Sequence, residues 1–87
     1  MPLSGMPSPG TEAMHKAMMA SMAEMQSMKT SGDTDRDYAK MMRMHHQQAI
    51  EMANAQLQHG KSPELKAMAK KIVAEQKKEI AQFDLAE

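Results

Sequence analysis

Two short breaks divide the sequence into three segments that all have helical periodicity. The first break is TSGDTD at residues 30–35, where aspartate and threonine side chains compete for backbone hydrogen bonds, and the second is HGKSPEL at residues 59–65. In the second break, Gly60 suits a helix end, Ser62 an N-cap and Pro63 the first helical position. Because no segment alternates apolar and polar residues as a strand does, the chain is predicted to be all-α.

The three segments predict helices over about residues 11–29, 34–59 and 62–85, joined by short loops as a small antiparallel helical bundle. Residues 1–10 hold three prolines, two glycines and two serines, and they are predicted to be a disordered arm before one helical domain over residues 11–87. A chain of 87 residues without cysteine has a small core and no disulfide, so dimerisation could complete the bundle.

Capping residues set the expected helix ends. Thr11 is the predicted N-cap of the first helix, and Glu12 follows in the first turn, where the helix dipole favours an acidic side chain. Gly32 offers a C-terminal stop after the first helix, and Gly60 is expected at the C′ position after the second.

Helical spacing also predicts which residues face the core. Gln76 interrupts the apolar stripe of the third helix, and a polar group there needs a hydrogen-bond partner. In the second helix, His45 and His46 fall on or beside the apolar side. The predicted stripes are Met14, Met18, Met22 and Met25 in the first helix; Met42, His45, His46, Ala49, Met52, Ala53 and Leu57 in the second; and Leu65, Met68, Ala69, Ile72, Val73, Ile80 and Phe83 in the third.

Methionine is unusually frequent, at thirteen of 87 residues. A methionine stripe at helical spacing is more often core than a set of ligands, but methionine specifies packing poorly because its three rotatable bonds leave it flexible. In the first two segments, the methionines also gather around three of the four histidines, His15, His45 and His46. Thioethers and imidazoles are ligands of Cu(I), and such residues three or four positions apart project side by side from a helix. Core packing and metal binding therefore both stay open.

Other functions fit the composition poorly. The formal net charge is zero, and one Tyr and one Phe offer little stacking surface, so nucleic acid is not an expected partner. No apolar run approaches the roughly 20 residues of a membrane span. The sequence has no HExxH motif, no phosphate-binding glycine loop and no cysteine nucleophile, so we do not expect an enzyme. The opening MPLSGMPSPG does not have the charged and apolar regions of a signal peptide, although a signal removed earlier would leave no trace.

The run GDTDRDYAKMMRMHHQQAIEMA, followed by GKSPELKAMAKKIVAEQKKEIAQF, resembles the CopM-like family, domain of unknown function 305. The hallmark is an acidic turn, then M-x-x-H-H-x-x-A-x-x-M, a Pro-Glu-Leu helix start and a Q-x-x-E-I stretch, and the resemblance covers roughly residues 11–85. One departure is the C-terminus, FDLAE, where members often end in Trp-Leu. The motif residues here are Met42, His45, His46, Ala49, Met52, Pro63, Glu64, Leu65, Gln76, Glu79 and Ile80.

The resemblance implies a small helical bundle, exported to the periplasm or cell surface, that binds Cu(I) or Ag(I) and supports copper resistance. A copper exporter or another copper protein is then the expected partner, and the chain would act as an extracytoplasmic buffer, carrier or chaperone. Absence of cysteine fits that compartment, since thioethers do not form disulfides.

The residues predict a central Cu(I) site at His45 and His46, with Met42 and Met52 on the same helix and Met18 or Met22 from the first. His46 as a buried structural residue is the alternative for that position. More than one ion is expected, with Ag(I) as a surrogate for Cu(I). The further donors are Met14, His15, Met19, Met25, Met28, Met41 and Met44.

A rival interpretation needs no metal. Flexible methionines also suit apolar interaction surfaces, so the chain could be a methionine-lined helical module that grips partner helices. Its simplest form is a homodimer that buries the first helix against its copy.

Overall fold

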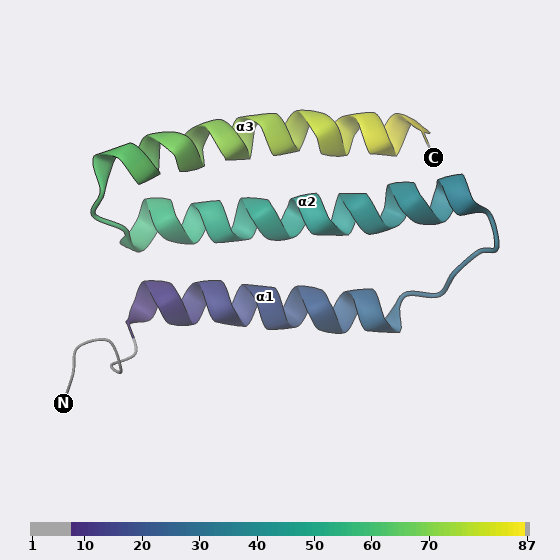
Figure 1. Cartoon of the computed structure of the whole chain (residues 1–87), viewed down its shortest axis with the longest axis horizontal. Helices are drawn as coiled ribbons and strands as arrows, with labels where there is room; N and C mark the ends of the chain where they lie inside the picture. Colours follow the sequence, from purple (N-terminus) through teal and green to yellow (C-terminus); the bar gives the residue numbers. More distant parts are fainter. Residues whose placement is uncertain (1–7, 87) are drawn as a thin grey trace.

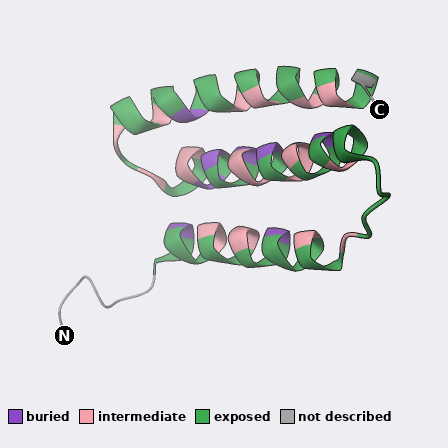
Figure 2. Cartoon of the chain, turned by 45° about the vertical axis from the view of Figure 1, so that its right-hand side comes forward, coloured by how far each residue is buried: buried purple, intermediate pink, exposed green. Residues whose placement is uncertain are grey.

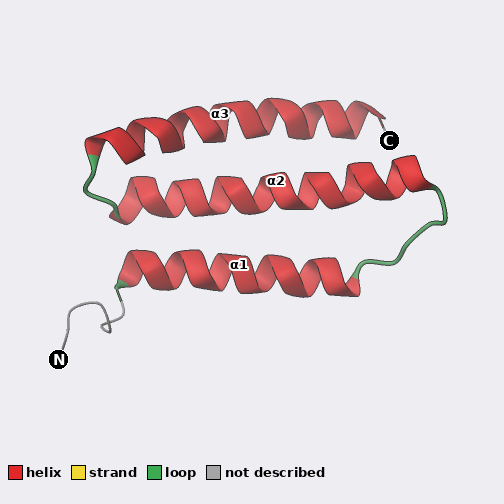
Figure 3. Cartoon of the chain, viewed as in Figure 1, coloured by secondary structure: helices red, strands yellow, loops and turns green. Residues whose placement is uncertain are grey.

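The computed structural model describes residues 8–86 and consists of three α-helices laid side by side in one layer (Figure 1). Helix α1 spans Pro9–Ser27, α2 spans Thr34–His59 and α3 spans Pro63–Ala86, and the part of the chain that the structure describes contains no strand (Figure 3). Successive helices run antiparallel, which confirms the predicted all-α bundle. Within the described residues α2 contacts both neighbours, whereas α1 and α3 do not contact each other, so the layer is open on both faces.

The first helix begins two residues before the predicted cap. Ser8 is the N-cap of α1, because its hydroxyl accepts the backbone N–H of Thr11 at 3.1 Å and Pro9 takes the first helical position. The prediction of Thr11 as N-cap is therefore wrong. Residues 1–7 of the predicted disordered arm lie outside the described residues. The helix ends at Ser27, short of the predicted end near residue 29.

The loop between α1 and α2 is held by side-chain acceptors. Asp33 caps α2 by accepting the backbone N–H groups of Asp35 and Arg36 at 3.0 and 3.3 Å. Ser31 donates both its backbone N–H and its hydroxyl to Asp37, and these two hydrogen bonds lower the pKa of the Asp37 carboxyl. Gly32 was expected to end the first helix, but α1 has already ended at Ser27. Gly32 instead lies in the turn into α2, where it adopts a φ of +88° that favours glycine.

The boundary between α2 and α3 is as predicted. Ser62 caps α3 by accepting the backbone N–H of Leu65 at 3.2 Å, and Pro63 is the first helical residue. Helix α2 ends at His59, but Gly60 closes it as the C-cap with an extended backbone (φ −74°, ψ 161°) rather than as a left-handed C′ residue.

The contacts between helices are made mainly by small side chains. No large side chain among the described residues is fully buried, and most buried positions lie on α2 (Figure 2). Small residues let the helices approach closely: a Cβ atom at Gly10 would lie 2.6 Å from the Cβ of His59, so the first turn of α1 needs glycine there. The buried apolar residues are Ala39, Ile50, Ala53, Ala55 and Ala69.

Much of the predicted core lies at the surface instead. Met22 of the α1 stripe is 46% exposed, Met52 of the α2 stripe is 38% exposed, and Leu65, Met68 and Ile72 of the α3 stripe are exposed as well. These assignments to the core were wrong because they assume helices grouped around a common axis. In a single row, a helix is covered only on the flank that faces a neighbour. Gln76 was expected to need a hydrogen-bond partner within the apolar stripe. Its Oε1 atom is buried and has no hydrogen-bond partner among the described residues.

Candidate metal centre

One face of the helix layer carries an apolar groove, which we call the groove face. The groove has a volume of about 350 Å³ and receives residues from all three helices. Its lining contains no charged side chain and one amide, Gln56. The lining residues are Met14, Ala49, Met52, Ala53, Gln56, Leu65, Met68, Ala69 and Ile72.

Helical spacing extends the groove face along the layer. On α2, Met42 and His45 lie at i−7 and i−4 from Ala49, so they continue the stripe that lines the groove. On α1, the remaining stripe methionines follow Met14 at i+4, i+8 and i+11 and share its side of the helix. The opposite face of α2 is polar and carries the exposed residues Lys40, Gln47, Glu51, Asn54 and Gln58. Most of the predicted sulfur donors therefore lie on one face of the layer.

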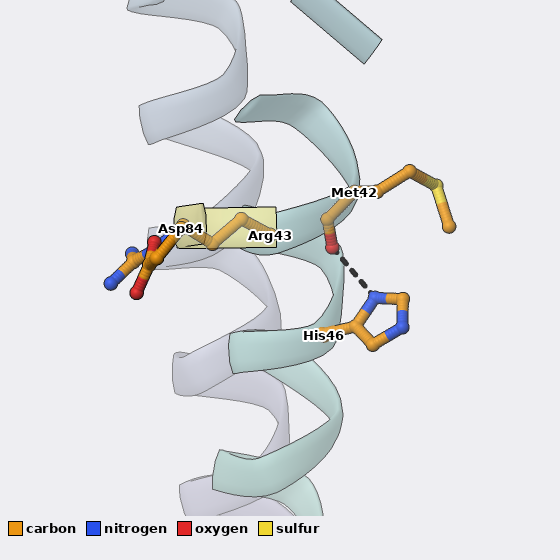
Figure 4. Close-up of polar contacts among 4 residues, drawn as sticks. All are labelled: Met42, Arg43, His46 and Asp84. Carbon is orange, nitrogen blue, oxygen red and sulfur yellow. Dashed lines mark hydrogen bonds and ion pairs between the residues drawn. The ribbon is translucent and has the colours of Figure 1, made fainter. Parts of the chain in front are cut away.

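His46 is tied into the contact between α2 and α3. Its Nδ1 atom lies 2.7 Å from the backbone carbonyl of Met42 (Figure 4). Its Nε2 atom contacts the carboxylate of Glu79 on α3. The ring also packs edge-on against Phe83, with centroids 5.3 Å apart. Both ring nitrogens thus have partners, and a metal ion at His46 would have to displace one of them.

His45 has the opposite surroundings. It was predicted on or beside the buried side, but it is exposed, and its ring forms no hydrogen bond with the residues that the structure describes. The reason is again the single layer, because the groove face has no helix above it. A ring with free nitrogens on a methionine-rich face is available to an ion without any rearrangement of the fold.

Two contacts set the register between α1 and α2. The Ser21 hydroxyl donates to the Gln48 side chain at 3.3 Å, and Gly10 packs against His59 at the end of the layer. Both contacts pair residues whose numbers sum to 69. Because antiparallel helices advance by the same rise per residue in opposite directions, any residue of α1 and residue of α2 whose numbers sum to about 69 lie at the same height along the layer. This register brings predicted ligands level in groups: Met18 with Met52, Met22 and Met25 with His45, Met25 with Met44, and Met28 with Met41.

The register refines the predicted ligand sets. Met18 lies level with Met52 rather than with His45, so the candidate partners of His45 from α1 are Met22 and Met25. Met19 is not brought toward α2, because it lies about 200° around the helix from Ser21, which is buried against α2. Met19 is 52% exposed at the outer edge of the layer. His15 is also exposed.

The donor chemistry on the groove face is soft. In the described part of the chain, no group of three or more His, Cys, Asp or Glu side chains could hold a metal ion. A site on this face would have to use thioethers, alone or with His45, and that donor set suits Cu(I) and Ag(I) better than Zn²⁺ or Mg²⁺.

Two partners of His46 were not predicted as functional. Glu79 and Phe83 lie on α3, one turn apart, and both contact the His46 ring. The Q-x-x-E-I stretch contains Glu79, but a motif gives no pairing between helices. Next to this contact, Arg43 forms an ion pair with Asp84 at 2.6 Å, on the other side of α2 from the Met42 side chain (Figure 4).

None of the described helices is long and apolar enough to cross a membrane.

No curated protein matches the chain. A family described as Domain of unknown function (DUF305) matches residues 3–86, which is nearly the whole sequence. The chain therefore belongs to the DUF305 family.

Proposed function

We propose that this protein binds Cu(I), and Ag(I) as its surrogate, through methionine thioethers and the His45 imidazole on the groove face. The observation that carries the proposal is that none of the predicted donor methionines is buried. The buried apolar residues are alanine and isoleucine, whereas Met19, Met22, Met41 and Met52 are exposed and the other predicted donor methionines are half-buried. Methionines that only filled a core would be covered. Neutral thioethers bind soft monovalent ions and do not titrate, so binding at these positions does not require loss of a proton.

The register supports several sites rather than one. Met22, Met25, Met42 and His45 form a first group, in which each helix supplies donors to an ion between α1 and α2. Met18 and Met52 lie level in a second group, and Met28 and Met41 in a third. Several open, moderate sites suit a buffer or carrier, whereas an enzyme uses one fixed site. The resemblance to CopM-like proteins adds an extracytoplasmic role in copper homeostasis, with a copper exporter or another copper protein as the partner.

Counting bound ions tests the proposal. Native mass spectrometry under reducing conditions is expected to show at least two Ag(I) or Cu(I) ions per chain, because the groups above are separated along the layer. Zn²⁺ offered at the same concentration is the control, and it should not bind, since few nitrogen or oxygen donors gather on this face. Absence of bound Ag(I) would contradict the proposal, and a strict limit of one ion would indicate a chaperone with a single transfer site.

Metal binding should also fix α1 on α2. Helix α1 contacts one neighbour only, and its buried residues are Gly10 and Ser21, so little apolar packing holds it. An ion that joins α1 methionines to α2 binds the docked state and stabilises it by about 2.7 kcal/mol at a hundredfold excess over Kd. Hydrogen exchange should therefore slow about a hundredfold in residues 12–27 on adding Ag(I). Residues 64–83 of α3 are the internal control, with smaller changes expected; an even slowing along the chain would contradict this coupling.

A metal-free interaction module is the second candidate, and the apolar groove is the observation that favours it. The apolar surface supports a different location for such a module than the first helix, which the sequence predicts. The exposed aliphatic residues lie on α3 and at its edge with α2, not on the methionine helix α1. The two candidates differ in whether sulfur is needed, which makes them separable by experiment.

A further inference from the structure

The helix layer has an apolar surface that its own chain cannot cover. Three residues of α3 on the groove, Leu65, Met68 and Ile72, are 51%, 59% and 37% exposed. Stable domains bury such stripes between two packed layers, and this chain supplies one layer. Since α1 and α3 do not meet, nothing in the described residues lies over the groove.

The surface area is too large for a compact chain of this size. A folded monomer of 9.7 kDa exposes roughly 5,100 Å², whereas this chain exposes 6716 Å². The radius of gyration is 15.3 Å, against about 12 Å for a compact domain of 87 residues. A standard protein interface removes about 800 Å² from each partner, so the difference in area is large enough for one such interface.

We propose that a second copy of this chain covers the groove, as a two-fold symmetric homodimer in which the groove faces of two layers stack. A two-fold contact brings a surface against itself, so its chemistry must be self-compatible. The groove meets this condition, because its lining carries no charge and the whole chain has a formal net charge of zero. Stacking two helix layers at the usual 8–10 Å between helix axes would turn two open layers into one two-layer core.

The dimer contact is centred on residues that are not predicted metal ligands. Leu65, Met68 and Ile72 are outside the predicted ligand set, and they lie where α3 meets the second half of α2. His45 and Met41 are not part of the groove lining. Met14 and Met52 belong both to the groove lining and to the predicted donors, so the dimer would cover part of the donor face. The contact through the apolar residues of α3 needs no metal, so a test in metal-free buffer distinguishes it from copper binding.

Sedimentation of the full chain in metal-free buffer with a Cu(I) chelator tests the dimer, from micromolar to submillimolar concentration. Wild-type protein should sediment at twice the mass of the 9.7 kDa chain and dissociate on dilution. Met68→Glu should weaken the dimer at least about a hundredfold, because it places a carboxylate in an apolar contact twice, once from each chain. Ala67→Glu is the matched control: it adds the same charge to the same turn at an exposed residue outside the groove lining, and it should leave the dimer intact.

Circular dichroism of each variant distinguishes lost association from lost folding. Met68 is largely exposed within one chain, so Met68→Glu should keep its helical content as a monomer. If it does not, Leu65→Glu replaces it, since an acidic side chain in the first turn of α3 suits the helix dipole. A wild-type protein that stays monomeric at every concentration overturns the proposal. So does a folded Met68→Glu or Leu65→Glu protein that associates as tightly as Ala67→Glu.

Discussion

His46→Ala is expected to destabilise the metal-free protein by about 2–3 kcal/mol, whereas His45→Ala costs less than about 0.5 kcal/mol. The His46 ring is buried, packs on Phe83 and contacts both Glu79 and the Met42 carbonyl. Since Glu79 is half exposed, its contact with the ring contributes under about 1 kcal/mol, and lost ring packing makes up most of the effect. In a domain of this size, the melting temperature should fall by roughly 10–20 °C for His46→Ala.

Cu(I) affinity should fall more in His45→Ala than in His46→Ala, which is the reverse of their effects on stability. His45→Ala removes an exposed imidazole beside Met22 and Met25, so Cu(I) affinity in a competition titration should fall at least about tenfold, or 1.4 kcal/mol. His46→Ala, studied at a temperature where it is folded, should keep most of its affinity. An equal loss of affinity in both variants would make His46 a ligand, as the sequence alone predicts, and would contradict a purely structural role.

Glu79→Gln separates the charge of the His46 contact from its packing. The glutamine amide can still form a hydrogen bond with the imidazole, through its oxygen as acceptor or its NH₂ group as donor, while the negative charge is gone. We expect a loss of stability under about 1 kcal/mol and no change in metal affinity, because Glu79 is half exposed and the ring keeps its place against Phe83. A loss as large as that of His46→Ala would show that the negative charge of Glu79, not the packing of the ring, stabilises this contact.

The helices could be predicted from the sequence because their ends are set by interactions within one turn. Ser62 and Pro63 place the start of α3 through a hydroxyl acceptor and a fixed φ, and both act within one turn. The start of α1 was misplaced for an equally local reason, since Ser8 and Thr11 are both good N-caps and Pro9 follows one of them. The free-energy difference between a helix capped by Ser8 and one capped by Thr11 is small, and the sequence pattern does not show which cap is favoured.

The packing of the faces could not be predicted in the same way. Periodicity shows that Ala49 and Met52 share a stripe, but it does not say what covers that stripe. Whether three helices close around an axis or lie in a row depends on contacts between α1 and α3, which are far apart in the sequence and absent among the described residues. His45 was therefore expected on or beside the buried side and is exposed instead.

The candidate site was predicted in part. The donors on the second helix follow from spacing alone, because a helix fixes which of its own residues share a side. Their partners on the first helix depend on the register, which is set by the Ser21–Gln48 hydrogen bond and the contact of Gly10 with His59. Those contacts favour Met22 and Met25 over Met18 beside His45.

The central claim is that the methionines of the groove face are present for their sulfur. A Cu(I) competition titration of the protein with norleucine in place of every methionine tests it, because norleucine keeps the length and apolarity of the side chain and removes the thioether. The substituted protein should keep its helices and lose Cu(I) affinity by at least about two orders of magnitude, since most donors in each group are gone. A norleucine protein that competes for Cu(I) as strongly as wild type would contradict the account, and it would leave the groove face as an apolar interaction surface alone.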